Sequence, residues 1–311
     1  MEEVISTMKK ITIIIPTYKR LSYLKIAVES CLQQSLLPER IIIGDDSPDD
    51  ETENWVGNFS PLKDVIIEYY HNRPSLKQAN NVEFLIQKVE TELLLLLHDD
   101  DFLLPVALES LYQVFDEQVG IDVAFGKQYI VSANGEIDYK ASEELNLAFF
   151  RNPSYHLQEL LPLDVALRQQ LPSNSFLMKT EMAKSVHYNF EEEARDAVDF
   201  LFCLNLAKAG VKFMFTDIHV SGYRITSDSI NSVGNPGYYS YKLVNELEVV
   251  GETLTEQKRD FLITKAPVAI LQALNMKLKK EAWTIYFSEH HRGRIFSLGG
   301  IKRGLKLITR F

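Results

Sequence analysis

The sequence predicts an α/β fold, in which a mostly parallel central sheet is flanked by helices and followed by a helical extension at the C-terminus. Over roughly the first 130 residues, short strand-like apolar runs alternate with segments of helical spacing. This alternation is typical of βαβ units, in which right-handed helical crossovers join parallel strands. From residue 241 onward the spacing of apolar residues is helical.

Four strands are predicted in the first part of the chain from its apolar runs. The first run is β-branched, and the fourth has five leucines between Glu92 and His98, as expected of a strand buried on both faces. Helical spacing, turn residues and a first-turn proline at Pro105 predict the helices. The predicted strands are 11–15, 41–43, 65–70 and 93–97, and the predicted helices are 21–33, 51–59, 75–89 and 105–115.

The second part of the chain has a less regular pattern. Asn134-Gly135 predicts a hairpin turn, and Gly210 predicts the end of a helix. Residues 226–240 are rich in Gly, Ser and Asn and predict a flexible loop. The predicted strands are 123–125, 128–131, 212–215 and 219–224, and the predicted helices are 157–169 and 194–209.

The composition indicates a globular protein. The chain has 311 residues, 46% of them hydrophobic, which is enough for one large domain or two small ones. Its formal net charge of −10 disfavours a nucleic-acid partner for the body of the chain. Cys31 and Cys203 have no metal-binding spacing, so buried thiols in a reducing compartment are expected. Because the sequence has neither a signal-peptide pattern nor a membrane-length apolar run, a soluble cytoplasmic protein is expected.

The last 22 residues differ from the rest of the chain in charge. Between His290 and Phe311 there is no acidic residue, and Ile301, Leu305 and Ile308 recur at helical spacing among the cations. A basic amphipathic end on an acidic protein predicts peripheral contact with an anionic membrane surface. Docking of this helix on the acidic body is the alternative. The cations are Arg292, Arg294, Lys302, Arg303, Lys306 and Arg310.

Three consecutive aspartates follow the leucine run directly. Asp99, Asp100 and Asp101 would repel one another unless a positive group lies among them. Open α/β sheets bind their ligands at the carboxyl ends of the strands, so this position is typical of a ligand site. The carboxylates predict Mg²⁺ or Mn²⁺ rather than Zn²⁺, because no Cys/His set accompanies them. A solvated acidic loop is the alternative.

Several common nucleotide and nucleophile motifs are absent. The segment after the first predicted strand is PTYKR, which has neither GxGxxG nor GxxxxGK[ST], and the chain has no GxSxG. Without a glycine cradle, a bound diphosphate would need a metal to neutralise it. The three aspartates supply the candidate for that metal site.

Taken together, several stretches resemble the family 2 glycosyltransferases, which have the Rossmann-like GT-A fold. The resemblance covers about residues 9–228 and is specific as an ordered set. It implies a GT-A domain at 9–228, with a nucleotide-binding half at 9–116 and an acceptor half at 117–228, before the helical extension at 239–311. The matching stretches are IIIPTYKR (13–20), IIIGDDSPDD (41–50), LLLLLHDDDFLLP (93–105), VDFLFCLNLAKAG (198–210) and the helix with Asn80.

The resemblance implies a role for each stretch. The first-strand loop and the second-strand aspartate of the family hold the nucleoside, and the carboxylates after the fourth strand form its DxD element. Asp100 matches the metal ligand, Asp101 extends the cluster, and His98 stands where many members have the first aspartate. The donor-binding residues implied in this way are Pro16, Thr17, Tyr18, Arg20, Asp46, Arg73, Asn80, Asp99 and Arg224, with a solvated cation as the alternative for Arg73.

Asp199 matches the catalytic base of the family. It precedes an apolar stretch that ends in Leu-Ala-x-x-Gly, although Val198 replaces the usual glutamate. Asp196, one turn earlier, is the alternative base, and a purely structural first-turn acid is the third interpretation of Asp199. Tyr223-Arg224 match a Tyr-Arg-x-His element in which Thr226 replaces the histidine.

The function implied by the resemblance is transfer of a sugar from a nucleotide-sugar, best matched by a UDP-sugar, to an acceptor hydroxyl with inversion. The implied cofactor is Mn²⁺ or Mg²⁺, and the implied acceptor is a glycan or a lipid-linked glycan of polysaccharide biosynthesis. Because His98, Val198 and Thr226 depart from the pattern, a non-catalytic binding or scaffold subunit is the alternative. A nucleotidyltransferase would need a glycine-rich loop in place of PTYKR. The sequence specifies neither the sugar, the linkage nor the oligomeric state.

Overall fold

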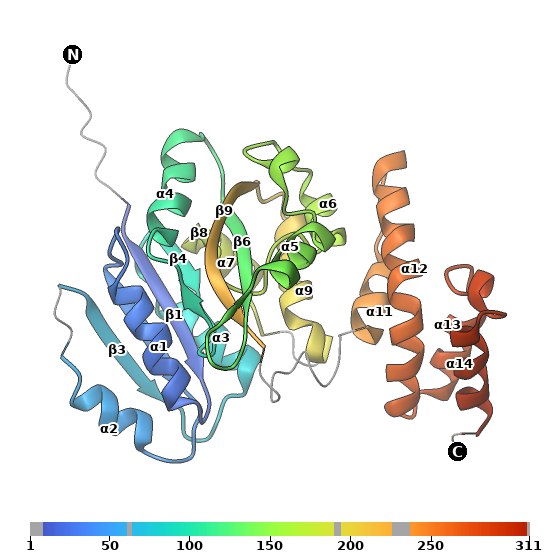
Figure 1. Ribbon diagram of the computed structural model, residues 1–311, viewed down its shortest axis with the longest axis horizontal. Helices are drawn as coiled ribbons and strands as arrows, with labels where there is room; N and C mark the ends of the chain where they lie inside the picture. The colour runs from blue at the N-terminus through green and yellow to red at the C-terminus, as the bar shows by residue number, and fades with distance from the viewer. Residues whose placement is uncertain (1–8, 61–63, 190–193, 226–236, 310–311) are drawn as a thin grey trace.

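The computed structural model describes residues 9–60, 64–189, 194–225 and 237–309. Their strands form one mixed sheet that runs through the first two thirds of the chain (Figure 1). The strands are β1 (Ile11–Thr17), β2 (Arg40–Asp45), β3 (Ile66–His71), β4 (Leu93–Leu96), β5 (Phe102–Leu103), β6 (Val123–Val131), β7 (Ile137–Asp138), β8 (Leu177–Lys179) and β9 (Phe213–Arg224).

The sheet has the strand order β3-β2-β1-β4-β8-β6-β9-β5, with β7 paired to β6. Strand β1 pairs in parallel with β2 and β4, and β2 pairs in parallel with β3. The carboxyl ends of these four strands therefore meet at one edge of the sheet. Strand β8 is antiparallel to β4 and β6, whereas β9 is parallel to β6. The predicted α/β fold is confirmed, and its sheet is mixed, with parallel pairs among β1 to β4 and between β6 and β9.

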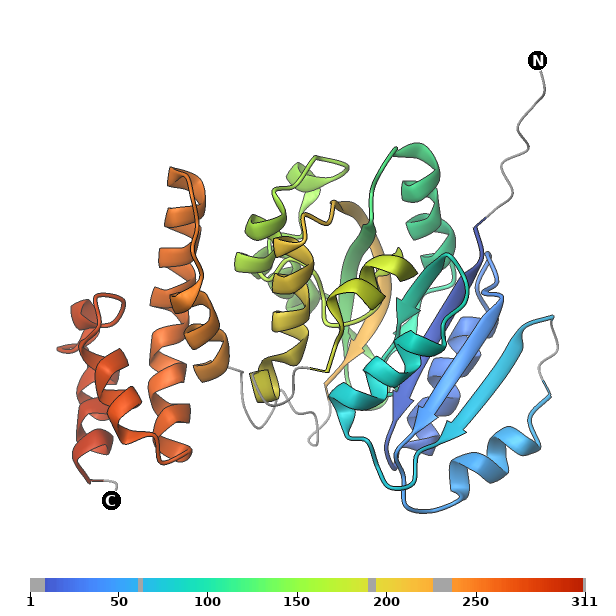
Figure 2. The ribbon, with the colours of Figure 1, turned by 180° about the vertical axis from the view of Figure 1, so that it is seen from behind.

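Helices cover both faces of the sheet, because its central strands are apolar on both sides. Ile13 and Ile15 of β1 belong to one buried cluster with α1 and α4, whereas Ile14 belongs to a second cluster with α3 and α9. Figure 2 shows α3, α7 and α9 on the face opposite to α1. These helices are α1 (Leu21–Leu32), α2 (Glu51–Gly57), α3 (Gln78–Lys88), α4 (Ala107–Glu117), α5 (Tyr139–Ala148), α6 (Pro162–Leu167), α7 (Thr180–Val186) and α9 (Val198–Lys208).

Several elements differ from the sequence prediction. The paired short strands predicted at 123–131 and at 212–224 are single long strands, because β6 and β9 pair along their whole length across a register shift after Phe125. A Cβ at Gly126 would lie 2.5 Å from the Ile218 carbonyl oxygen, so this residue permits the close approach. Strands β5 and β8 and helices α5 and α7 were not predicted, and the helix predicted at 157–169 is the shorter α6. Asp138 caps α5 by accepting a hydrogen bond from the Ala141 N–H.

The helical extension predicted after residue 241 is confirmed. It packs on α6 and α9 through a continuous buried cluster, in which Phe200 stacks on Phe261 with 5.2 Å between ring centroids. None of the described helices is long and apolar enough to cross a membrane. Residues 226–236 of the predicted loop lie outside the described residues. The helices are α11 (Tyr238–Glu246), α12 (Glu252–Asn275), α13 (Lys279–Phe287) and α14 (Leu298–Thr309).

Candidate active site

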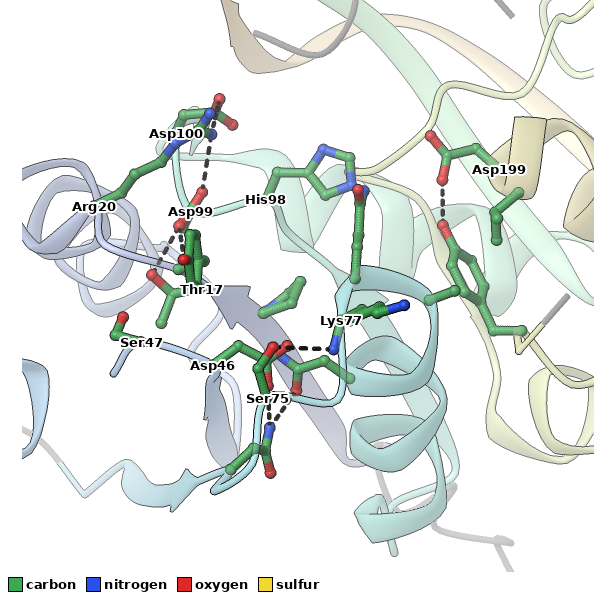
Figure 3. Close-up of a pocket in the computed structure, with 18 of the residues that line it drawn as sticks. Thr17, Arg20, Asp46, Ser47, Ser75, Lys77, His98, Asp99, Asp100 and Asp199 are labelled. Carbon is green, nitrogen blue, oxygen red and sulfur yellow. Dashed lines mark hydrogen bonds and ion pairs between the residues drawn. The ribbon is translucent and has the colours of Figure 1, made fainter. Parts of the chain in front are cut away.

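A cavity of about 920 Å³ lies at the carboxyl ends of β1, β2 and β4, as expected for a ligand site in a parallel sheet. Figure 3 shows Asp99 and Asp100 on one side of it, Asp199 on the other, and His98 between them. We call residues 98–101 the acidic loop. The predicted residues that line the cavity are Pro16, Thr17, Tyr18, Arg20, Asp46, Arg73, Asp99, Asp100, Asp199 and Arg224.

Asp99 is held by the end of β1. Its Oδ2 atom accepts a hydrogen bond of 2.7 Å from the Thr17 hydroxyl and one of 3.3 Å from the Tyr18 N–H. Burial raises the pKa of Asp99 to about 6, with the Asp100 charge adding to the rise and the Thr17 bond opposing it. The β1 loop therefore positions this carboxylate rather than leaving it to solvent.

Asp100 is paired with a cation of the same chain. Arg20 Nη1 lies 2.6 Å from Asp100 Oδ2 and 3.5 Å from Asp99 Oδ1. Arg20 stands just before α1, which brings its guanidinium over the acidic loop (Figure 3). Part of the repulsion expected among these aspartates is thus offset by arginine.

Asp101 is buried and points toward the protein rather than into the cavity lining. It accepts hydrogen bonds from the Arg224 N–H at 2.7 Å and from Asn174 Nδ2 at 2.8 Å. Burial raises the pKa of Asp101 to about 7, with Asp100 adding to the rise and His98 opposing it. Its contacts join the acidic loop to the end of β9.

The acidic loop fits a divalent cation. One ligand atom each from His98, Asp100 and Asp101 can be chosen so that all three lie within 4.8 Å of one another. His98 Nε2 is buried and has no hydrogen-bond partner in the described part of the chain, although buried polar atoms are normally paired. The two carboxylates suit Mg²⁺ or Mn²⁺, whereas an imidazole ligand is more typical of Zn²⁺, Fe, Cu and Ni ions. The loop thus offers both the charge and an unpartnered polar atom.

The predicted nucleoside side of the cavity is built around Asp46 at the end of β2. Asp46 Oδ1 accepts hydrogen bonds from Asn72 Nδ2 at 2.9 Å and from the Leu76 N–H at 3.1 Å. Asn80 is exposed, donates to the Leu76 carbonyl and is not among the lining residues. Its neighbour Asn81 is buried, lines the cavity and donates to the Gly44 carbonyl at 2.8 Å.

The two predicted arginines of this region have partners within the protein. Arg73 is about half exposed and pairs with Asp50 at the rim. Arg224 is buried, with Nε donating to the Asp100 carbonyl at 2.8 Å and Nη1 donating to the carbonyls of Ser132 and Ala133. Arg224 therefore ties the acidic loop to the β6–β7 hairpin, and a bidentate contact with diphosphate would require some of these bonds to break.

Asp199 begins α9 and faces the cavity across from the acidic loop (Figure 3). The hydroxyl of buried Tyr188 donates to Asp199 Oδ1. Burial and the neighbouring Asp199 charge raise the pKa of Tyr188 well above its ordinary value, so the hydroxyl stays protonated. The side chain of Asp196, the alternative base, lies outside what the structure describes.

Sequence reasoning did not identify Asn81 or Tyr188, and it gave Asn174 an acceptor-facing role only as the weaker alternative to a polar turn. Asn80 and Asn81 are neighbours on α3, and the turn of the helix leaves Asn80 exposed and Asn81 buried. Asn174 belongs to the PSNS segment, which reads as a polar turn. Tyr188 lies 11 residues before Asp199, and no local pattern marks the pair.

The chain is similar to known glycosyltransferases in sequence. The model of a family described as Glycosyl transferase family 2 matches residues 12–175, more than half of the chain. A Campylobacter jejuni protein, GalNAc(5)-diNAcBac-PP-undecaprenol beta-1,3-glucosyltransferase, is 32% identical over 111 residues. That match covers 35% of this chain and only 36% of the relative. An uncharacterized glycosyltransferase of Methanocaldococcus jannaschii is 22% identical over 74% of this chain and 77% of its own.

Solved structures share the fold. TarS 1-349 of S. aureus in complex with UDP aligns over 96% of this chain and 88% of its own, with a TM-score of 0.65 and 14% identity. The mannosyltransferase PcManGT from Pyrobaculum calidifontis, in complex with GDP-Man and Mn²⁺, aligns over 98% of this chain and 88% of its own, with a TM-score of 0.58 and 10% identity. At these identities the likeness concerns the fold alone.

Proposed function

Because this chain belongs to glycosyl transferase family 2, we propose that it transfers a sugar from a UDP-sugar to an acceptor hydroxyl with inversion. The observation that carries the proposal is that Asp199 and the acidic loop line opposite sides of one cavity. A base on one side and anion-stabilising groups on the other are what a single displacement at a sugar carbon needs. A non-catalytic scaffold role is not favoured, because it gives no reason for this arrangement.

We place the nucleoside at the ends of β1 and β2. One oxygen of Asp46 already accepts from Asn72 and the Leu76 N–H, which orients the carboxylate to accept an imide N–H of uracil with the other. Thr17 and Tyr18 line the same wall. The complexes of TarS with UDP and with UDP-GlcNAc support this class of donor. Asn81 replaces Asn80 in this proposal, since only Asn81 lines the cavity.

We assign the cofactor to the acidic loop. Asp100 and Asp101, joined by His98, would hold Mn²⁺ or Mg²⁺, and the neighbour with bound Mn²⁺ supports the first of these. When bound, the ion supplies positive charge that offsets the charge on a leaving diphosphate. Asp99, fixed by Thr17, would face the ribose and phosphate groups.

Asp199 acts as the general base in this proposal. Tyr188 donates to one carboxylate oxygen, which leaves the other to accept the proton of the acceptor hydroxyl. The hydroxyl oxygen attacks the anomeric carbon as the bond from that carbon to the diphosphate oxygen breaks, and the electron pair leaves with the UDP. A single displacement of this kind inverts the anomeric configuration.

The acceptor is proposed to be a glycan, and the name of the Campylobacter jejuni relative supports a lipid-linked one. On this proposal the protein works in the cytoplasm and meets its acceptor at the inner face of the membrane. A thermal-shift screen of nucleotide-sugars with and without Mn²⁺ would identify the donor, because at equal concentration a ligand that binds more tightly raises the melting temperature more.

The decisive experiment substitutes Asp199 by Asn. We expect turnover to fall by about 10²–10⁴-fold while UDP-sugar affinity is retained, because only proton transfer is lost. Asp116→Asn, at an exposed position of α4 outside the cavity lining, is the matched control. Wild-type turnover in Asp199→Asn would contradict the assignment of the base.

The metal assignment has its own test. Calorimetry of UDP binding to Asp100→Ala, with and without Mn²⁺, should show that Mn²⁺ no longer increases the affinity. If Mn²⁺ increases UDP affinity as much in the variant as in the wild type, the acidic loop is not the cation site.

A further inference from the structure

The segment before α14 and the outer face of α14 form a surface that is both apolar and basic. Phe296 and Leu298 are 91% and 82% exposed, and Ile301, Leu305 and Ile308 are 47% to 58% exposed. Exposed cations alternate with these side chains. We call this set the basic apolar surface, and it comprises Arg292, Arg294, Phe296, Leu298, Ile301, Lys302, Leu305, Lys306 and Ile308.

The orientation of α14 is fixed by its inner face. Leu307 is fully buried, and the Tyr286 hydroxyl donates to the Gly300 carbonyl at 3.2 Å. Arg303 Nε donates to the ring of buried His291 at 3.1 Å. A Cβ at Gly300 would lie 1.9 Å from the Arg294 carbonyl oxygen, so this contact requires glycine. Because the inner face is locked on α13 and the preceding segment, the apolar side chains cannot turn inward.

The cations of this surface are not neutralised by the protein. Arg292, Arg294, Lys302 and Lys306 have no ion pair among the described residues, and the sequence from His290 to Phe311 contains no acid. The whole chain nevertheless has a formal net charge of −10. A segment of net positive charge therefore lies at one end of the molecule, away from the sheet (Figure 1).

We propose that the basic apolar surface docks the protein on membranes that contain anionic phospholipid. The apolar side chains would enter the boundary between headgroups and acyl chains, and the lysines and arginines would contact anionic headgroups. With 12 residues, α14 is too short to span a bilayer, which takes about 20, so it would lie in the plane of the interface. A protein partner would also cover apolar side chains, but the concentration of unpaired cations favours the anionic surface. This inference does not depend on the proposed activity.

The test is co-sedimentation of the full chain with vesicles, without nucleotide or metal. We expect binding to vesicles of about 30% phosphatidylglycerol in phosphatidylcholine, and at least about tenfold weaker partitioning to phosphatidylcholine alone. Lys302→Glu/Lys306→Glu should weaken binding to the anionic vesicles at least about tenfold. Ile301→Ser/Leu305→Ser should weaken it with the charge unchanged. The exposed pair Lys208→Glu/Lys212→Glu, which changes the net charge equally, should bind as the wild type does.

Three outcomes would overturn the inference. They are no binding to anionic vesicles, equal binding to both vesicle types, and equal loss in the control pair. The same apolar variant tests the competing occupant. A dimer that light scattering detects in the wild type and not in Ile301→Ser/Leu305→Ser, together with no vesicle binding, would assign the surface to a second copy of the chain. Far-UV circular dichroism and UDP affinity measured on every variant separate loss of docking from loss of folding or of donor binding.

Discussion

Arg20 Nη1 lies 2.6 Å from Asp100 Oδ2, so the acidic loop is paired with a cation of its own chain. Three consecutive aspartates in the sequence predict a positive group among them. In the structure Arg20 supplies part of that positive charge. A divalent cation bound by Asp100 would then compete with Arg20, or share the carboxylate with it. This relationship determines how the site responds to metal.

Arg20→Met should increase Mn²⁺ affinity by about tenfold, because it removes a like charge a few Å from the proposed ion while keeping the volume of the side chain. Titration of Mn²⁺ by electron paramagnetic resonance measures this directly. Lys25→Met, on the exposed side of α1, is the matched control and should change little. Unchanged or weaker Mn²⁺ binding in Arg20→Met would show that Arg20 does not compete for the site.

Mn²⁺ affinity should rise with pH. The pKa values of Asp99 and Asp101 are raised to about 6 and about 7, mainly by burial. Below these values the carboxyls hold protons that an ion must displace, so affinity should increase by up to about tenfold per pH unit for each proton released and should level off above pH 7. Calorimetry in buffers of different ionisation enthalpy would count those protons. A flat profile from pH 5 to 8 would contradict the coupling.

The same raised pKa values make the stability of the ion-free protein fall with pH, whereas the Mn²⁺ affinity rises. Its native state retains protons that the unfolded chain releases near the ordinary value of 3.8. The free energy of unfolding should therefore fall as the pH rises from about 4 to 7 through these two groups. Added Mn²⁺ should reduce that fall, which thermal melts at several pH values would measure.

Tyr188→Phe should lower turnover by about tenfold without changing the donor KM, because the lost hydrogen bond orients the proposed base rather than the donor. Tyr139→Phe, at a position 69% exposed, serves as the control. Wild-type turnover in Tyr188→Phe would show that this hydrogen bond does not orient the base.

Gly44→Ala should destabilise the fold by about 1–3 kcal/mol. A Cβ at Gly44 would lie 2.3 Å from Asn81 Oδ1 and about 3 Å from Leu85, where α3 packs against β2. Gly57→Ala, at a helical position with open space, should be neutral or slightly stabilising. Thermal melts of the two variants make the comparison. Equal melting temperatures would mean that Asn81 and Leu85 can shift to admit the added methyl group without loss of stability.

The first half of the fold could be predicted from the sequence because its signals are local. The runs that became β1 and β4 are apolar without alternation, which is typical of strands covered on both faces. The second half follows longer-range pairing. Gly126 looks like a strand break along the chain, yet β6 continues through it because β9 lies alongside. Pairing between distant segments has no signal in the local spacing of apolar residues, so the length of these strands could not be predicted.

The sequence by itself determined the α/β class, the family, and the order in which the carboxylates and Asp199 occur, because each is written in contiguous residues. Only the tertiary structure decided which side chains meet. Helix phase selects Asn81 over Asn80 for the cavity, the end of β9 brings Arg224 onto the acidic loop, and the start of α9 brings Asp199 onto Tyr188. Such contacts depend on the relative placement of elements far apart in the chain, and burial and hydrogen-bond geometry act only once those elements have packed.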